Sequence, residues 1–254
     1  GAKHASAADR DKIREVGRWF LHNYEETGSA VFSTLGTMRM VRVNQGVGGL
    51  PTRNFQEGQF EGFEAISSET MDERITVNRD TCYGCPVRCK WVVEVDSDKY
   101  PVEPKYGGPE YETAGAMGSM CGVDDLEAVA YANQLCNANG LDTIGTGSTI
   151  AFAMECYERG LLGPEDTDGQ ELTFGNAEAL IETIKKIIKR EGLGDILAEG
   201  SRRAAEHIGG EARDYSMSIK GQEVAMHDPR VKYGHGLGIA VSPTGADHMH
   251  SVHD

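Results

Sequence analysis

The sequence has too few basic residues for a general nucleic-acid-binding or anionic-membrane surface. It holds 25 Lys and Arg against 40 Asp and Glu, which gives a formal net charge of −15. A chain this acidic repels phosphate backbones and anionic lipids, so we expect neither nucleic acid nor membrane as a partner. It also lacks an apolar run long enough to span a membrane, and its first residues are not the apolar core of a secretory signal. We therefore expect a cytoplasmic protein.

The cysteines are too few and too unevenly spaced for a secreted fold held together by disulfides. Three of the six lie within eight residues, at Cys82, Cys85 and Cys89. In a reducing compartment such a cluster indicates metal. The other three are scattered, and we interpret them as small core residues: Cys121, Cys136 and Cys156.

Alternation typical of β-strands is scarce, and only residues 89–95 (CKWVVEV) read as a short strand. Apolar residues at helical spacing instead predict helices over five stretches: 7–25, after a capping box at Ser6 to Asp9, and 124–139, 148–159, 176–191 and 195–208. Residues 30–78 are punctuated by glycine and proline and are predicted to be irregular, except that 37–43 could form a short helix or a strand. The predicted fold class is mainly α, a multihelical domain with irregular glycine-rich loops.

Four residues mark the predicted helix ends. Asp124 and Asn176 are candidate N-caps, because their side chains can accept hydrogen bonds from the first backbone N–H groups of a helix. Gly140 and Gly192 are candidate C-terminal residues, because glycine adopts the left-handed conformation that ends many helices.

The spacing of the cysteine cluster is C-x2-C-x3-C. Three thiolates on one loop can occupy three corners of a 4Fe–4S cube, with the fourth ligand supplied from elsewhere. Zinc sites usually combine two ligand pairs, and a second pair is missing here. A structural zinc with one remote ligand and a loop of three thiols without metal stay open as alternatives.

The segment GPEYET holds Glu110, Tyr111 and Glu112 after a loop-forming Gly-Pro pair. A carboxylate that is buried at such a place can act as a base, with a pKa tuned by its surroundings. Acids that only begin a helix are the simpler interpretation, and the local sequence favours it.

Residues 136–143 (CNANGLDT) place Asn137, Gly140, Asp142 and Thr143 around a helix end. Their acceptors and amide suit a ligand with N–H and O–H edges, such as a pterin or a purine. A C-cap followed by the N-cap of the next helix explains the same residues, and is locally the better explanation.

Histidine is concentrated near the end of the chain, where five of the eight lie: His227, His235, His248, His250 and His253. A metal site is one interpretation. The spacing of His248 and His250 does not suit one face of a helix, so a loop lining a pocket, with one histidine as acid or base, fits better.

Taken together, these segments resemble those of one family. The segments are CYGCPVRC (82–89), GPEYET (108–113), CNANGLDT (136–143), KGQEVAMHDPR (220–230) and SPTGADHMHS (242–251). In this order, and over nearly the whole chain, they resemble the tungsten- or molybdenum-pterin aldehyde ferredoxin oxidoreductases.

The resemblance implies a division of the chain into two parts. Residues 1–216 resemble the family's helical middle domain with its iron–sulfur cysteine loop, and residues 217–254 resemble the start of its C-terminal helical domain. The family's N-terminal β-rich domain and its fourth cluster cysteine have no counterpart in the sequence. We therefore expect the isolated chain to be inactive and to bind neither tungsten nor a stable cluster.

The resemblance also implies roles for the catalytic and cluster residues. Glu112, beside Tyr111, matches the active-site glutamate, and His248 matches the active-site histidine. The cluster ligands are matched by Cys82, Cys85 and Cys89.

The pterin-binding residues are matched with one departure. Asn137 stands where the family has an aspartate, so an acceptor is kept and a charge is lost. The family's metal between subunits would need a glutamate and a histidine where Tyr131 and Gln134 stand, so we expect no bridging ion. The expected cofactor-binding residues are Asn137, Gly140, Leu141, Asp142 and Thr143, together with Tyr111.

The implied cofactors are a 4Fe–4S cluster and a tungsten (or molybdenum) bis-pterin. The implied reaction oxidises an aldehyde to a carboxylic acid, with the electrons passing through the cluster to ferredoxin. Expected partners are ferredoxin and a small aldehyde or acid substrate, and a homodimer is one of the oligomeric states left open. Alternatives are a relative that reduces carboxylic acids or aromatic acyl thioesters and, from another class, a non-catalytic helical domain with structural zinc.

Overall fold

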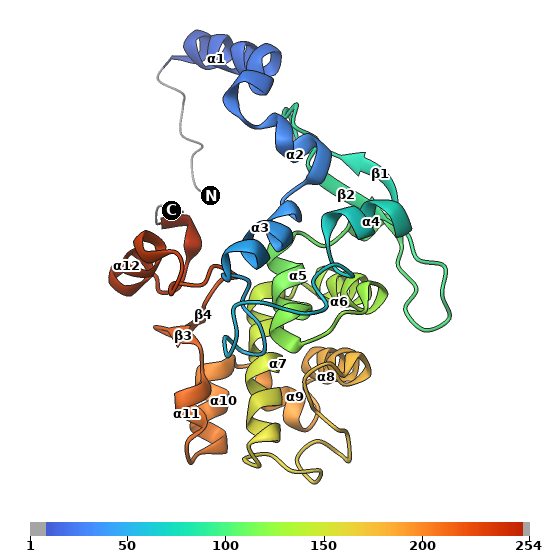
Figure 1. Cartoon of the computed structure of the whole chain (residues 1–254), viewed down its shortest axis with the longest axis vertical. Coiled ribbons are helices and arrows are strands. Elements are labelled where there is room, and N and C mark those ends of the chain that lie inside the picture. The colour runs from blue at the N-terminus through green and yellow to red at the C-terminus, as the bar shows by residue number, and fades with distance from the viewer. Residues whose placement is uncertain (1–8, 251–254) are drawn as a thin grey trace, which may run out of the picture.

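A computed structural model describes residues 9–250 of the chain. In this part the chain forms twelve α-helices and two small antiparallel sheets of two strands each. The helices α5 to α8 lie in the middle of the molecule, with the strands and the shorter helices around them (Figure 1). The predicted mainly α, multihelical fold is confirmed.

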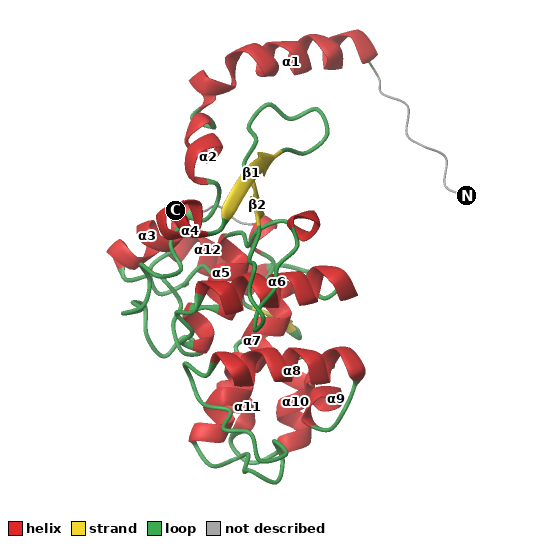
Figure 2. Cartoon of the chain, turned by 90° about the vertical axis from the view of Figure 1, so that its right-hand side faces the viewer, coloured by secondary structure: helices red, strands yellow, loops and turns green. Residues whose placement is uncertain are grey.

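The N-terminal part, as far as residue 74, is more helical than the sequence indicated. Ser6, where the predicted capping box starts, lies outside the described residues, and Asp9 caps the first helix by accepting a hydrogen bond from the N–H of Lys12 at 2.9 Å. This helix stands apart from the rest of the molecule (Figure 2) and buries none of its residues. The elements are α1 (Arg10–Asn23), the 3-10 helix η1 (Tyr24–Thr27), α2 (Ala30–Leu35), α3 (Arg39–Val47) and α4 (Ser68–Arg74).

The prediction of an irregular segment over residues 30–78 is therefore partly wrong. The helices within it are short, so each offers few turns over which a helical period could be recognised. Packing explains α3, which buries Val41 and Asn44.

The predicted strand at 89–95 is present as β2 (Lys90–Val93), which pairs with β1 (Thr76–Asp80). The loop between them, residues 81–89, carries the cysteine cluster and projects toward α1 (Figure 2). A short 3-10 helix, η2 (Pro104–Tyr106), follows before the central helices begin.

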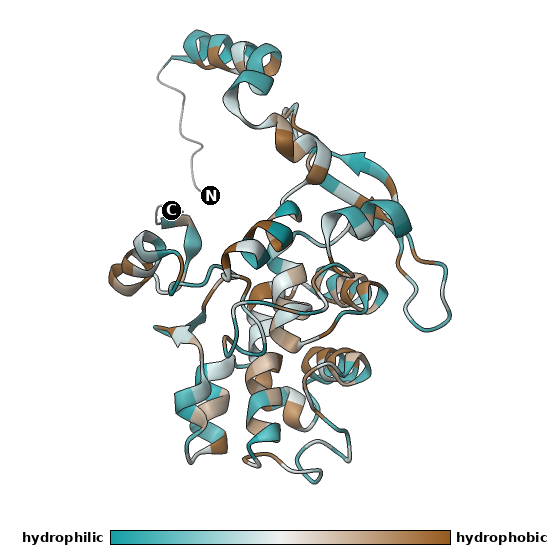
Figure 3. Ribbon diagram, in the orientation of Figure 1, coloured by the Kyte–Doolittle hydropathy of each residue, from teal (hydrophilic) through white to brown (hydrophobic). Residues whose placement is uncertain are grey.

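At the centre of the fold, α5 (Tyr111–Met117) packs across α7 (Thr143–Glu158). The 3-10 helix η3 (Ser119–Cys121) contacts both of them, and α6 (Leu126–Asn139) packs against α8 (Ala177–Lys189). Gly147 permits the close crossing of α5 and α7, since a Cβ atom there would lie 2.6 Å from the backbone of Ala116. Apolar residues are prominent on α7 and α8, whereas α1 is mostly hydrophilic (Figure 3).

The predicted caps of the central helices are partly correct. Gly140 ends α6 with a left-handed φ of 70°, and Asn176 caps α8 by accepting from the N–H of Ala179 at 3.1 Å. The cap of α6 is wrong by one residue, because Asp125 and not Asp124 accepts the first N–H groups. Adjacent aspartates compete for such a role, and the sequence does not decide between them.

Other predicted helix boundaries are wrong for reasons of backbone conformation. The helix predicted at 148–159 begins at Thr143, because Asp142 caps it. The helix α8 ends at Arg190, which itself adopts a left-handed φ of 55°, and not at Gly192. The predicted helix 195–208 is broken at Gly200 into two: α9 (Leu193–Leu197) and α10 (Ser201–Ile208).

The last described segment folds back onto the central helices. It comprises α11 (Ala212–Tyr215), β3 (Ser218–Ile219), β4 (Gln222–Glu223), α12 (Tyr233–Val241) and η4 (His248–His250). Strand β4 packs against α7, and the turn after it lies on α5. Met226 contacts Gly115 so closely that a Cβ atom on this glycine would lie 2.6 Å from Met226 Cγ. The domain boundary at 216/217 stays a prediction.

Between residues 9 and 250, no helix is both long enough and apolar enough to span a membrane.

Candidate functional site

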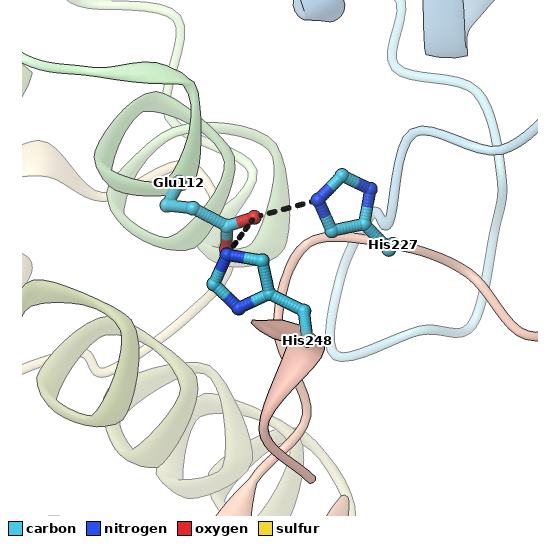
Figure 4. Close-up of side chains that lie close together, drawn as sticks. All are labelled: Glu112, His227 and His248. Atoms are coloured by element: carbon cyan, nitrogen blue, oxygen red, sulfur yellow. Dashed lines mark ion pairs between the residues drawn. The ribbon is translucent and has the colours of Figure 1, made fainter. Parts of the chain in front are cut away.

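A carboxylate and two histidines from distant parts of the chain meet at the start of α5 (Figure 4). Glu112 lies in the first turn of this helix, and its Oε2 accepts a hydrogen bond from the N–H of Met226 at 2.8 Å. Its Oε1 lies 3.0 Å from Nε2 of His227 and 4.0 Å from Nε2 of His248. The structure thus brings together the two predicted catalytic residues, Glu112 and His248, and adds His227 between their segments.

The ring of His227 is enclosed by aromatic neighbours. The ring centroids of Tyr111, His235 and His248 lie 5.5, 5.6 and 5.5 Å from that of His227. His227 is buried, and His235 is fully buried on α12. These contacts fix the plane of the imidazole that faces Glu112.

Tyr111 fastens the turn that carries His227 to α5. Its hydroxyl donates a hydrogen bond to the carbonyl oxygen of Met226 and accepts one from Nδ2 of Asn44 at 2.6 Å. All of this lies in the buried interior, where an unmade hydrogen bond is costly. Two adjacent residues of α5, Tyr111 and Glu112, therefore bind both backbone polar groups of Met226.

The surroundings keep Glu112 ionised and Tyr111 neutral. Burial works to raise the pKa of Glu112, but the hydrogen bond and charge of His227, the N–H of Met226 and the charge of His248 together outweigh it, so the pKa lies below its ordinary value. Burial, reinforced by the charge of Glu112, raises the pKa of Tyr111. An ionised carboxylate beside imidazole groups is an arrangement suited to acid–base chemistry.

The same three side chains also satisfy the distances of a metal site. Within residues 9–250 they form the one group of three potential ligands whose donor atoms all lie within 4.8 Å: Glu112, His227 and His248. Two imidazoles and a carboxylate can bind a divalent ion. In the arrangement observed, however, Glu112 Oε1 and His227 Nε2 contact each other directly, as an acid–base pair does.

His227 is the functional residue that sequence reasoning missed. It was one of five clustered histidines, with no feature to distinguish it from His235 or His250. The contact depends on a fold-back that places Met226 beside Glu112 across 114 residues of chain. His250 instead pairs with Asp247 at 3.1 Å at the surface, and His253 lies outside the described residues.

Two cavities with shared walls lie beside this cluster. The smaller, of about 160 Å³, is lined by His248 together with Asp142, Gly145 and Glu223. The larger, of about 480 Å³, shares these last three residues and adds Leu141. Asp142 is held in place as the N-cap of α7, its Oδ2 accepting from the N–H of Gly145 at 2.6 Å. Two carboxylates on these walls can accept hydrogen bonds from the N–H edges of a pterin.

The remaining predicted pterin residues are placed differently. Asn137 turns toward another loop, where its Nδ2 donates to the carbonyl oxygen of Tyr106 at 3.0 Å. Thr143 shares a hydrogen bond of 2.9 Å with the hydroxyl of Thr113, and Gly140 serves as the C-cap of α6. The capping interpretation of this segment is thus correct, while Leu141 and Asp142 also line a cavity.

The cysteine loop is a tight, exposed turn. The N–H of Cys85 donates to the carbonyl oxygen of Cys82 at 3.0 Å, and the hydroxyl of Thr81 donates to the carbonyl oxygen of Cys85 at 2.6 Å. Gly84 and Arg88 both adopt left-handed φ values, of 72° and 54°. These turns keep the three thiols on one short loop.

The thiols are near one another but do not form a single-ion site. Burial raises the pKa of Cys89, and the charges of Glu110, Cys82 and Cys85 raise it further, which places the three sulfurs in one neighbourhood. Sulfurs bound to one zinc ion at about 2.3 Å lie no more than about 4.6 Å apart. The cysteines do not all meet a limit of 4.8 Å. A 4Fe–4S cube does not require that closeness, because each thiolate binds a different iron.

The other three cysteines are core residues, as predicted. Cys121, Cys136 and Cys156 are buried without exposure in η3, α6 and α7. Burial raises the pKa of Cys136 and of Cys156 to about 12 and raises that of Cys121 as well. Such thiols stay protonated and do not offer thiolates to a metal.

One strand connects the cysteine loop to the Glu112 cluster. Immediately after Cys89, the carbonyl oxygen of Trp91 in β2 accepts a hydrogen bond from the N–H of Gly108 at 2.8 Å. A Cβ atom on Gly108 would lie 2.8 Å from Val93, so glycine allows the two segments to touch. Four residues beyond Gly108 the chain reaches Glu112.

Comparison with known families gives one match over most of the chain. The sequence model described as "Aldehyde ferredoxin oxidoreductase, domains 2 & 3" matches residues 15–253. A tungsten-containing aldehyde ferredoxin oxidoreductase of Pyrococcus abyssi is 39% identical over 254 residues, which covers 98% of this chain and 41% of that protein. The chain thus spans about two fifths of the length of such curated relatives.

Two further similarities concern proteins with other reactions in their names. The WOR-like subunit of an aliphatic sulfonate oxidoreductase of Pyrococcus furiosus is 35% identical over 78% of this chain and 32% of that protein. A benzoyl-coenzyme A reductase active-site complex, solved with 1,5-dienoyl-CoA, matches with a TM-score of 0.56 and 27% identity. That match covers 76% of this chain and 29% of the solved chain.

Proposed function

Because the chain belongs to the aldehyde ferredoxin oxidoreductase family, we propose that it is part of a tungsten- or molybdenum-pterin enzyme that oxidises small aldehydes to carboxylic acids. The reaction consumes one aldehyde and one water and yields one carboxylic acid, two protons and two electrons. Ferredoxin is the proposed acceptor, and the cytoplasm the proposed location. The observation that supports this most directly is the proximity of Glu112 to His248, which lines a cavity.

Glu112 is the proposed general base. Its lowered pKa means that it is ionised and ready to accept a proton from the attacking water. His248, whose Nε2 lies 4.0 Å from Glu112 Oε1, is proposed to hold the aldehyde oxygen and to donate a proton to it. Groups of this kind typically contribute about a hundred- to ten-thousandfold in rate.

The proposed metallopterin site is the wall formed by the cavities beside α7. Asp142 and Leu141 line this wall, and the carboxylate of Asp142 is positioned to accept from pterin N–H groups. When bound, the metallopterin supplies the two-electron acceptor. Gly140 and Thr143 are proposed to shape the turn, while Asn137, which bonds Tyr106, would have to turn away from that partner to reach a pterin.

Cys82, Cys85 and Cys89 are the proposed ligands of a 4Fe–4S cluster. Their C-x2-C-x3-C spacing on one loop, without the second ligand pair that zinc sites usually have, supports a cluster over structural zinc. When bound, the cluster supplies one-electron transfer to ferredoxin.

A second candidate reaction is the reduction of carboxylic acids or aromatic acyl thioesters. Similarity to the benzoyl-coenzyme A reductase complex favours it. For carboxylic acids, whose reduction is the reverse of aldehyde oxidation, the same pair of residues serves both directions, since the base that takes a proton from water in oxidation returns it when water leaves in reduction.

The test is anaerobic purification of the full-length protein that contains this chain, followed by analysis of metal and pterin and by assays in both directions. We expect tungsten or molybdenum, iron and pterin, and aldehyde-dependent reduction of ferredoxin. Zinc without iron, or colourless protein, would contradict the cluster. Acid or thioester reduction without aldehyde oxidation would favour the second reaction.

A further inference from the structure

The proposed reaction leaves His227 without a role, although it makes the shortest contact that Glu112 has with a charged or ionisable side chain. Resting on the proposed function, we propose that His227 is a positioning residue. It holds the carboxylate of Glu112 in one orientation, ionised and facing His248, so that the base is ready before substrate enters.

The first support is that both oxygens of Glu112 are bound by consecutive residues of one turn. Oε2 accepts from the backbone N–H of Met226 at 2.8 Å, and Oε1 lies 3.0 Å from Nε2 of His227. With both oxygens held, the carboxylate plane cannot rotate without breaking one of the two contacts. The oxygen held by His227 is also the one that lies toward His248.

The second support is that the turn carrying His227 is itself fixed to α5. Met226 packs on Gly115, and its carbonyl oxygen accepts a hydrogen bond from Tyr111. The imidazole of His227 lies against Tyr111 and His235 and is buried. Because the ring of His227 is packed on several sides, it restricts the orientations that the carboxylate of Glu112 can adopt.

The third support is electrostatic. Of the forces on Glu112, burial alone disfavours the charged form, and the largest opposing contribution comes from the contact of 3.0 Å with His227. Without that contact the pKa of Glu112 would rise, so a larger fraction would be protonated and unable to act as a base at low pH. The titratable groups around the pair, from all the elements packed on it, are Tyr111, Asp142, Glu223, Asp228, His235, Asp247 and His248.

The role differs from that of a catalytic residue. His248 lines the smaller cavity, and the exposed fraction of the side chain falls from 24% for His248 to 18% for Glu112 and 9% for His227. We infer that His227 acts through Glu112 and does not touch substrate.

The experiment compares His227→Phe, which keeps the ring and removes the hydrogen bond, with His227→Gln, which keeps a donor and removes the ring. His207→Phe is the matched control, because His207 is an exposed histidine of α10. All variants are made in the cofactor-loaded protein, and their metal and pterin contents are measured first. Whichever reaction the wild type catalyses is then followed as a function of pH.

For His227→Phe we expect the acidic limb of the kcat/KM profile to move up by roughly one to two pH units, since a hydrogen bond to a charged group has about that effect. We expect kcat to fall by roughly tenfold to a hundredfold, with KM changed less than about threefold. His227→Gln should recover most of both, and His207→Phe should match the wild type.

An independent readout uses no turnover. Infrared difference spectra recorded against pH report the carbonyl band of a protonated carboxylic acid, assigned to Glu112 by its loss in Glu112→Gln. We expect this band at higher pH in His227→Phe than in the wild type. An unmoved band together with an unmoved pH limb, in protein with normal metal content, would overturn the role of His227.

The infrared readout also separates the two proposals. If the protein proves to catalyse neither reaction, the proposed function fails, but the shift of the Glu112 band still tests the positioning role. If the wild type is active and the band does not move, the positioning role fails alone.

Discussion

The Glu112 cluster and the cysteine loop differ in how completely the chain assembles them. At Glu112, three distant segments meet in a buried network: Oε2 accepts from the N–H of Met226, Oε1 lies 3.0 Å from His227, and His227 packs on His248. The cysteine loop, by contrast, is partly exposed, and its sulfurs approach one another without reaching the closeness of ligands on one ion. The folded chain therefore positions the acid–base residues through its own packing, but for the proposed cluster it supplies only thiol ligands on a loop.

The difference has a physical origin. A carboxylate and an imidazole attract each other, so their contact helps to stabilise the fold that holds them. Three thiols gain little from mutual contact, and as thiolates they repel, so only a bound cation makes their proximity favourable. A single sequence can thus encode one site as a folded contact and the other as a set of ligands on a loop.

The largest effect expected from this comparison is at the loop. Cys85→Ala should abolish the cluster and with it electron transfer to ferredoxin, because one of the proposed iron ligands is lost. Iron content and visible absorption measure this. Cys121→Ala is the control, since Cys121 is a buried core thiol, and it should keep its iron. Full iron content in Cys85→Ala would show that the loop is not the cluster site.

The next effect is at the carboxylate. Glu112→Gln keeps the shape but removes the base, and should lower kcat by about a hundred- to ten-thousandfold. Metal and pterin content should stay normal, because Glu112 does not belong to the proposed ligand sets. Wild-type turnover in Glu112→Gln at normal metal content would show that Glu112 is not the base.

A smaller effect should appear in the free energy of unfolding, which we expect to be more sensitive to substitution at the Glu112 cluster than on the cysteine loop. Tyr111→Phe removes a buried hydroxyl and leaves Nδ2 of Asn44 and the carbonyl oxygen of Met226 without their partner, at a cost of about 1–3 kcal/mol. Tyr83→Phe on the cysteine loop changes a fully exposed hydroxyl and should cost almost nothing. Urea denaturation of both variants measures the difference. Equal losses would mean that the Glu112 region is no more tightly built than the loop.

The smallest effect concerns Asn137. Asn137→Asp restores the charge found in the family pattern but removes the hydrogen bond to the carbonyl oxygen of Tyr106, so the free energy of unfolding should fall by about 1 kcal/mol. Asn78→Asp is a control at an exposed position of strand β1, because the side-chain Oδ1 that accepts from the N–H of Arg79 is kept in aspartate. Pterin content should stay unchanged in Asn137→Asp. A clear gain in pterin content would place residue 137 in the pterin site and correct our assignment.

Local features of the fold were predictable because they depend on neighbouring residues. The mainly α class, the strand after Cys89, the C-cap at Gly140 and the N-cap at Asn176 all follow from periodicity or from the chemistry of helix ends. The errors arise where two neighbours offer the same chemistry, as at Asp124 and Asp125, or where a residue other than glycine adopts a left-handed conformation, as at Arg190.

The site was predictable only where a family pattern carried it. Glu112 and His248 were identified by resemblance, and their proximity is now a feature of the structure. His227 was not identified, because its role depends on the hydrogen bonds of Met226 and Tyr111 across more than a hundred residues of chain. No local pattern contains that information.

Gly115 has a consequence for how this site can change over time. Gly115 lies one helical turn after Glu112, and Met226 occupies the volume that an alanine side chain at this position would need. The position of His227, which follows Met226, relative to Glu112 therefore depends on residue 115 being glycine. A substitution at that position would push the 224–228 turn outward and loosen the grip on the carboxylate, while every reacting side chain stayed the same. A substitution in the apolar contact between Gly115 and Met226 therefore changes the reactivity of Glu112 without replacing any acid or histidine.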